Sequence, residues 1–229
     1  MREHLFSTLP HPALSHGERV KSKPAITGLY AITPDLADTN EFLRKVRLAL
    51  QGGARVLQYR NKIADAALQL QQATALRNLT REFDTTFIVN DDAALAAQVD
   101  ADGVHLGGED GSVAAARAVL GAAKLIGVSC YNRASLALAA QQQGADYVAF
   151  GAFFPSSVKP EAVKAEVSML RGARKEIAVP IVAIGGITQQ NGVELVNAGA
   201  DSLAVISALW DAPNIEASAK DFSTLFSRT

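Results

Sequence analysis

The chain has 229 residues, of which 48% are hydrophobic and 20% are charged. This length suits one large globular domain or two small ones, and the composition is too apolar for a largely disordered protein. The 22 basic and 23 acidic residues nearly cancel, which excludes a strongly basic nucleic-acid-binding molecule. A single cysteine, Cys130, excludes an internal disulfide and a cysteine-built zinc site. No run approaches the roughly 18 apolar residues of a membrane span, so we expect a cytoplasmic protein.

The first 25 residues differ from the remainder in composition. They hold three of the eight prolines and three of the four histidines, without a sustained apolar period. We therefore predict a disordered N-terminal tail over residues 1–25 and one catalytic domain over residues 26–229. His4, His11 and His16 are scattered and lack carboxylate or thiolate partners, so we do not interpret them as metal ligands.

From residue 28 onward, short β-rich apolar runs alternate with longer amphipathic stretches, which is the pattern of βα units. We expect strands at 29–33, 55–59, 86–90, 103–106, 125–129, 147–150, 181–184 and 203–206. Helical spacing of apolar residues is clearest at 66–83, 113–120, 133–143 and 189–197. The sequence Gly-Ala-Asp recurs at 144–146 and 199–201, and 99–102 is a variant of it. Each copy falls where a helix should end and a strand begin.

Eight strand–helix units predict an α/β fold, a single-domain (β/α)8 TIM barrel. An open doubly wound sheet is the alternative, although no G-x-G-x-x-G follows the first strand. In a barrel, the chemistry belongs at the C-terminal ends of the strands.

The residues at the predicted strand ends indicate a phosphate site. Arg60 and Lys62 follow the second predicted strand, Lys159 follows the sixth, and all three suit phosphate oxygens. Asp91 and Asp110 supply the hard oxygen ligands that Mg²⁺ uses when substrate phosphates complete its coordination. After the seventh and eighth strands, Gly185-Gly186 and Ile206-Ser207 stand where barrels commonly hold a phosphate on backbone N–H groups. Two anion sites suggest two phosphorylated ligands.

Each of these features also has a structural interpretation. Arg60 and Lys62 could form surface salt bridges. Asp91 or Asp92 could cap the third helix, with Asp92 preferred, and Asp110 could cap the fourth. His105, within a strand, fits an interior histidine with satisfied hydrogen bonds. Cys130 has no adjacent base or cation in the sequence and fits a buried, unreactive thiol.

Several blocks, in fixed order over about residues 28–212, resemble the thiamine phosphate synthase (thiamine-phosphate pyrophosphorylase) family. They are Leu29-Tyr30-Ala31-Ile32-Thr33, Gln58-Tyr59-Arg60-Asn61-Lys62, Asn90-Asp91, Ala101-Asp102-Gly103-Val104-His105-Leu106-Gly107, Gly127-Val128-Ser129, Gly144-Ala145-Asp146-Tyr147-Val148, Pro155-Ser156-Ser157-Val158-Lys159-Pro160, Ala183-Ile184-Gly185-Gly186-Ile187 and Ala204-Val205-Ile206-Ser207.

The resemblance implies a transferase that joins 4-amino-2-methyl-5-(diphosphooxymethyl)pyrimidine to a thiazole phosphate and releases pyrophosphate. By position, Asp91 and Asp110 match the Mg²⁺ ligands. The matches for the pyrimidine diphosphate are Gln58, Arg60, Lys62, Asn90, Ser129 and Lys159, with Tyr59 and Asn61 in the same block. The matches for the thiazole phosphate are Ser156, Ser157, Val158, Gly186, Ile206 and Ser207. The expected partners are these small molecules, with no nucleic acid and no membrane, and a homo-oligomer remains compatible with the sequence.

Two departures from the family pattern affect these expectations. The loop after the sixth strand usually carries Thr-x-Thr-Lys, and Val158 here lacks the second hydroxyl, although a backbone N–H at 158 could still serve. Gly108 stands where Gln or Glu is common. A thiazole tautomerase on the same barrel and a non-catalytic phosphate-ligand sensor are the rival functions. The retained cations and carboxylates favour the synthase.

Overall fold

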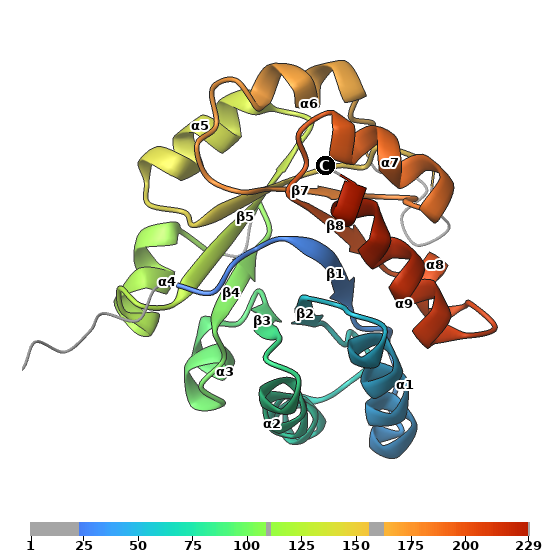
Figure 1. Ribbon diagram of the computed structural model, residues 1–229. Helices are drawn as coiled ribbons and strands as arrows, with labels where there is room; N and C mark the ends of the chain where they lie inside the picture. The colour runs from blue at the N-terminus through green and yellow to red at the C-terminus, as the bar shows by residue number, and fades with distance from the viewer. Residues whose placement is uncertain (1–22, 109–110, 156–162, 229) are drawn as a thin grey trace, which may run out of the picture.

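The computed structural model describes residues 23–108, 111–155 and 163–228, and within them eight parallel strands close into a barrel (Figure 1). The strands are β1 (Gly28–Ile32), β2 (Val56–Tyr59), β3 (Thr86–Asn90), β4 (Gly103–Leu106), β5 (Leu125–Tyr131), β6 (Tyr147–Phe150), β7 (Ile181–Ile184) and β8 (Ser202–Val205). Each strand pairs with its neighbours in chain order, and β1 pairs with β8. The predicted TIM barrel is confirmed, and the open sheet is excluded.

Helices surround the barrel (Figure 1). They are α1 (Thr39–Gln51), α2 (Ala66–Glu82), α3 (Ala93–Gln98), α4 (Val113–Leu120), α5 (Ala134–Gln142), α6 (Val167–Ala173), α7 (Gln189–Asn197), α8 (Ser207–Trp210) and α9 (Ile215–Thr224), followed by a 3₁₀ turn, η1 (Leu225–Arg228). No described helix is long and apolar enough to cross a membrane.

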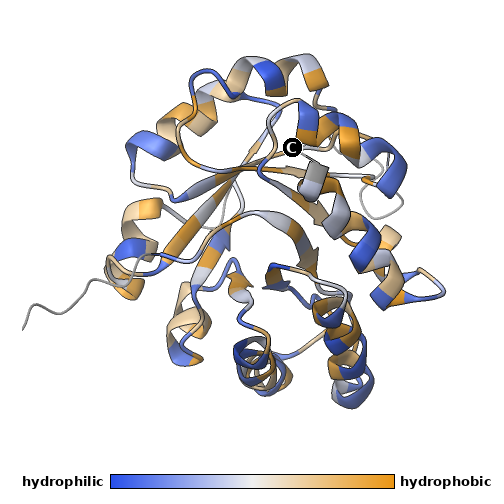
Figure 2. Ribbon diagram, in the orientation of Figure 1, coloured by the Kyte–Doolittle hydropathy of each residue, from blue (hydrophilic) through white to orange (hydrophobic). Residues whose placement is uncertain are grey.

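Alternation along the strands separates two apolar cores. Leu29, Leu57 and Val89 belong to the core between the barrel and the helices, whereas Tyr30, Val56 and Ile88 fill the barrel interior. In Figure 2 the strands are largely hydrophobic, and the helices that surround them carry both hydrophobic and hydrophilic residues. The described interior of the barrel is therefore filled by apolar side chains.

Side-chain caps define where several helices begin. Asp92 accepts a hydrogen bond from the Leu95 N–H at 2.8 Å, as predicted for a residue capping α3. The cap of α4 is Ser112, which accepts from the Ala115 N–H at 3.1 Å. The capping alternative for Asp110 is therefore wrong, because α4 begins three residues later.

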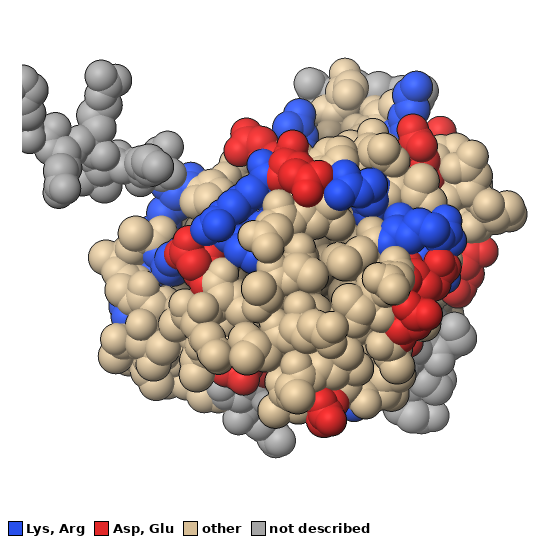
Figure 3. All heavy atoms as spheres, turned by 90° about the horizontal axis from the view of Figure 1, so that it is seen from below, with Lys and Arg blue, Asp and Glu red and all other residues tan. Residues whose placement is uncertain are grey.

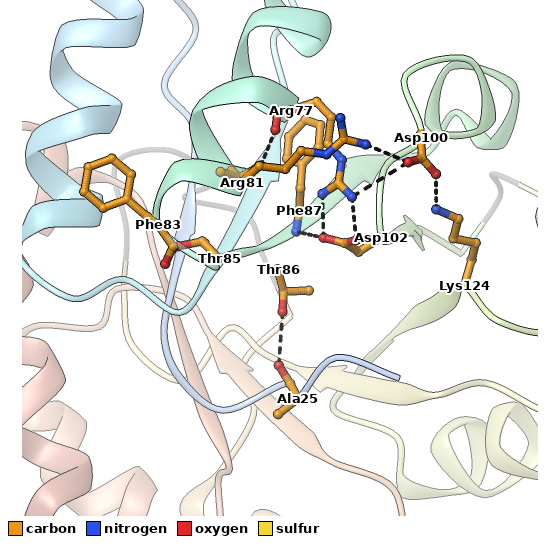
Figure 4. A network of polar contacts seen from close by, with 11 residues as sticks. Ala25, Arg77, Arg81, Phe83, Thr85, Thr86, Phe87, Asp100, Asp102 and Lys124 are labelled. Carbon is orange, nitrogen blue, oxygen red and sulfur yellow. Dashed lines mark hydrogen bonds and ion pairs between the residues drawn. The ribbon is translucent and has the colours of Figure 1, made fainter. Parts of the chain in front are cut away.

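Charged side chains of both signs lie beside one another on the face in Figure 3, which agrees with the near-neutral net charge. One group is drawn in Figure 4. Arg77 of α2 donates two hydrogen bonds to Asp102, at 2.9 and 3.0 Å, and Asp102 also accepts from the Phe87 N–H at 2.8 Å. Asp102 thus joins α2 to the beginning of β3.

The same arrangement recurs at β5 and β7 and explains the Gly-Ala-Asp repeats. Asp146 accepts from the Ile126 N–H and pairs with Arg117, and Asp201 accepts from the Ile181 N–H and pairs with Arg174. At each repeat, the residue two positions before the aspartate takes a positive φ, which ends the preceding helix: 89° at Gly144, 105° at Gly199 and 53° at Asp100.

The segment before β1 runs across the N-terminal end of the barrel (Figure 1). Ile26 is 3% exposed and belongs to the interior core, and the Ala25 carbonyl accepts from the Thr86 hydroxyl. Lys23 pairs with Asp146. The last residues of the predicted tail therefore contact the barrel, and residues 1–22 lie outside the described part.

Candidate functional site

A cavity of about 400 Å³ opens at the C-terminal ends of the strands, where the barrel predicts the chemistry. A second cavity of about 220 Å³ lies beside it, and the two share Ile184, Gly185, Ala204 and Ile206. Of the predicted site residues, Gln58, Arg60, Asn90 and Ser129 line the larger cavity, and Gly186, Ile206 and Ser207 line the smaller one. Residues predicted from different strands thus meet in two adjoining cavities.

The end of β2 is held against the end of β1. The Arg60 N–H donates to the Thr33 hydroxyl at 2.9 Å, which in turn donates to the Arg60 carbonyl at 2.8 Å. The Arg60 guanidinium is 17% exposed and lies 3.6 Å from Asp35, so it forms an ion pair and also faces the cavity. Lys62 is exposed, and its N–H donates to Asp35 at 2.8 Å.

The side chains of Tyr59 and Asn61 turn away from both cavities. Tyr59 donates to Gln72 of α2 at 3.1 Å, and Asn61 donates to Gln72 and to the Leu36 carbonyl. All three are buried. These two residues of the predicted block therefore fix the loop after β2, while Gln58 and Arg60 line the larger cavity.

A carboxylate follows β3 at the rim. Asn90 donates to Asp91 at 2.5 Å, and the Asp91 N–H donates to the His105 carbonyl at 2.8 Å. Asp91 has a positive φ of 64°, a conformation that orients it out of the strand direction. Among the residues that the structure describes, no group of three or more His, Cys, Asp or Glu side chains could hold a metal ion.

Sequence reasoning interpreted His105 as an interior histidine, and its hydrogen bonds confirm this. His105 is 8% exposed, with Nδ1 at 3.1 Å from the Tyr147 hydroxyl and Nε2 at 2.9 Å from the Ser129 hydroxyl. Tyr147 is also 3.0 Å from the Tyr30 hydroxyl, which accepts from Gln58 at 3.0 Å. Burial raises the pKa of Tyr30 and of Tyr147 above the usual tyrosine range, so both hydroxyls keep their protons.

The smaller cavity is built largely from backbone. Gly185 and Gly186 have positive φ values of 103° and 59°. A Cβ on Gly186 would lie 2.3 Å from the Pro155 carbonyl oxygen, so only glycine fits this turn. The Asn191 side chain donates to the Gly186 carbonyl at 3.0 Å and fixes it to the beginning of α7.

Five predicted site residues lie outside the described residues: Asp110, Ser156, Ser157, Val158 and Lys159. The structure therefore brings together Gln58, Arg60, Asn90 and Ser129, with Asp91 next to Asn90 and Lys62 exposed in the loop after β2.

Comparison with known proteins now adds to this geometry. Residues 29–209 match the family model described as thiamine monophosphate synthase. The chain belongs to this family. A thiamine-phosphate synthase from Methylobacillus flagellatus is 55% identical over 205 residues, covering 90% of this chain and 98% of the relative. One from Thiobacillus denitrificans is 51% identical over 199 residues, covering 87% and 94%. A solved thiamine phosphate pyrophosphorylase from Pyrococcus furiosus superposes with a TM-score of 0.81 at 35% identity, covering 88% and 96%.

The family relationship confirms the resemblance found in the sequence blocks. Sequence reasoning does not identify several residues that line the larger cavity, among them Tyr30, Tyr131 and Val163. Alternation along β1 places Tyr30 inside the barrel, which was a usable signal. Tyr131 has none, because it follows a register shift at the end of β5 and takes a φ of 54°.

Proposed function

We propose that the chain condenses 4-amino-2-methyl-5-(diphosphooxymethyl)pyrimidine with 4-methyl-5-(2-phosphooxyethyl)thiazole, giving thiamine phosphate and pyrophosphate in thiamine biosynthesis. The observation that carries this proposal is the pair of adjoining cavities in a member of the thiamine monophosphate synthase family. The larger cavity has a cation at its wall, and the smaller one is formed by glycine-rich backbone. Two phosphorylated ligands can thus meet across the residues that the cavities share.

The larger cavity is assigned to the pyrimidine diphosphate. Arg60, Lys62 and Asn90 offer donors to its diphosphate, and Gln58 and Ser129 offer polar contacts deeper in the barrel. Lys159 is assigned as a third cation of this cavity because of its position in the family pattern. Tyr59 and Asn61 support this group by fixing the loop between Gln58 and Lys62.

The reaction requires pyrophosphate to leave the pyrimidine methylene while the thiazole nitrogen arrives. An electron-rich aminopyrimidine stabilises positive charge on that methylene, so the step needs neither a protein nucleophile nor a strong base. The work of the protein is to align the two ligands and to stabilise charge developing on the leaving pyrophosphate. Arg60 does this from a position where it is 17% exposed, which limits the competition from water.

The carboxylate of Asp91 fits a magnesium ligand. It is a hard oxygen donor at the rim of the cavity, and Mg²⁺ bound through one or two carboxylates completes its coordination with water and substrate phosphates. Asp91, with Asp110, would hold the ion. When bound, Mg²⁺ supplies positive charge that neutralises the diphosphate.

The smaller cavity is assigned to the thiazole phosphate. Gly186, Ile206 and Ser207 offer backbone N–H groups and one hydroxyl. Ser156, Ser157 and Val158 are assigned to the same group by their place in the family pattern. A Val158→Thr variant tests whether the missing hydroxyl weakens this subsite, since it should then lower the KM for the thiazole phosphate.

An assay of both substrates with Mg²⁺ tests the proposal. We expect pyrophosphate and thiamine phosphate in equal amounts. A tautomerised thiazole without pyrophosphate would favour the isomerase, and binding without turnover would favour the sensor. Lys159→Ala should reduce turnover by about 10²–10³-fold, the loss typical of a preorganised charge stabiliser. A rate near that of the wild type would remove Lys159 from the site.

The finer predictions of a cytoplasmic location and a homo-oligomer stay predictions. Cell fractionation tests the first, and light scattering of the purified chain tests the second.

A further inference from the structure

Five polar side chains from five different strands form one hydrogen-bonded chain in the barrel interior. In order they are Gln58, Tyr30, Tyr147, His105 and Ser129, and successive polar atoms are separated by 3.0, 3.0, 3.1 and 2.9 Å. Four of them line the larger cavity. Tyr147 is fully buried and its ring packs against that of His105, with an interplanar angle of 30° and ring centroids 5.5 Å apart.

Either hydroxyl of the Tyr30–Tyr147 pair can donate, and one consistent set of directions gives every buried hydroxyl proton an acceptor. The Gln58 Nε2 can only donate, so the Tyr30 oxygen accepts it. The single proton of Tyr30 then goes to Tyr147, which is its other partner in the described structure. Because Tyr147 has accepted from Tyr30, its own proton goes to His105 Nδ1.

His105 is thereby assigned one tautomer. With Nδ1 accepting, the neutral imidazole carries its proton on Nε2 and donates to the Ser129 oxygen, 2.9 Å away. The Ser129 oxygen then accepts a hydrogen bond from His105. The hydroxyl proton of Ser129 remains available to an acceptor in the cavity, which Ser129 lines.

We propose that Tyr147 is a positioning residue, which acts through His105 to set the Ser129 hydroxyl as a hydrogen-bond donor to the pyrimidine diphosphate. This inference rests on the proposed function for the identity of the ligand. The diphosphate and the ring nitrogens of that ligand are acceptors, so a serine held as a donor is complementary to them. In the reverse direction, Ser129 would donate its proton to His105 Nε2 and present only oxygen lone pairs to the cavity, which repel the same atoms.

The tautomer of His105 tests the relay without any substrate. In the full chain labelled with ¹⁵N-histidine, the His105 resonances are those lost in His105→Gln, and long-range ¹H–¹⁵N spectra report which nitrogen carries the proton. We expect Nε2 in the wild type. Tyr147→Phe removes the donor to Nδ1 and should populate the Nδ1–H tautomer.

Tyr30→Phe is the matched control for the spectra. It removes a buried tyrosine hydroxyl from the same chain but leaves the Tyr147 hydroxyl next to His105. The Nε2–H tautomer should therefore persist in Tyr30→Phe. A wild-type protein protonated at Nδ1, or a Tyr147→Phe variant with an unchanged tautomer, would overturn the proposal.

A kinetic cycle separates positioning from general packing. Tyr147→Phe should lower kcat/KM for the pyrimidine diphosphate by about 10-fold, the effect of one directed hydrogen bond. In a Ser129→Ala background the same substitution should cost less than about 2-fold, because the group that it positions is gone. Equal losses in both backgrounds would show a structural role only and overturn the proposal. If the wild type forms no thiamine phosphate, the proposed function fails, and the substrate-free spectra decide the relay by themselves.

Discussion

Replacing Asp102 by asparagine should lower the free energy of unfolding by about 2–3 kcal/mol. The variant keeps an oxygen for the Phe87 N–H but loses the charge that pairs with Arg77. Removing one partner of a buried ion pair costs about 3–5 kcal/mol. We expect less here, because the Arg77 and Asp102 side chains retain 13% and 18% exposure and Asp100 lies 4.0 Å from Arg77.

Thermal unfolding measures this effect directly. For a chain of this length, 2–3 kcal/mol corresponds to a fall in Tm of about 4–6 °C. Glu82→Gln is the control, because the Arg47–Glu82 pair is about half exposed and should contribute less than about 1 kcal/mol. Adding Arg77→Leu to Asp102→Asn should recover part of the loss, since no unpaired charge remains. The reasoning is refuted if Asp102→Asn melts like the wild type or if Glu82→Gln costs as much.

Three further predictions concern Ile26 at the N-terminal end of the barrel, Gly186 in the turn after β7, and Cys130. Ile26→Ala should cost about 2–4 kcal/mol in denaturant unfolding, because Ile26 is 3% exposed in the interior core; an unchanged midpoint would contradict its role there. Gly186→Ala should raise the KM for the thiazole phosphate by about 10–100-fold, through displacement of the turn, while the KM for the pyrimidine diphosphate stays within about 2-fold. Burial raises the pKa of Cys130 from 9.0 to about 12, so its contribution to stability is complete below pH 9 and is lost as the pH rises toward 12. Unfolding free energy should therefore fall less steeply between pH 9 and 11 in Cys130→Ala than in the wild type, and equal slopes would argue against a buried thiol.

Local patterns in the sequence predict most of the barrel. The bounds of β3, β4, β6 and β7 agree with the residues expected from apolar runs flanked by turn residues. The end of β5 does not, because the expected strand stops at the polar Ser129 and the observed one continues to Tyr131. Pairing with β6 extends the strand to Tyr131 through a register shift, which is a tertiary effect.

The residues of the candidate site were also predictable only in part. Arg60, Asn90 and Gly186 were predictable, because the barrel brings every strand's C-terminal end to one edge. The outward turn of Tyr59 and Asn61 was not, since it depends on Gln72 in the next helix. The Tyr30–Tyr147–His105 contacts join residues 117 and 42 positions apart, so they need the register of the closed barrel.

A crystal structure of the chain with thiamine phosphate, pyrophosphate and Mg²⁺ tests the central claim of two adjoining anion subsites most directly. We predict the thiamine phosphate group beside Gly186 and Ser207, and the pyrophosphate beside Arg60 with Mg²⁺ on Asp91. Pyrophosphate bound away from Arg60, or both anions in the smaller cavity, would contradict the account.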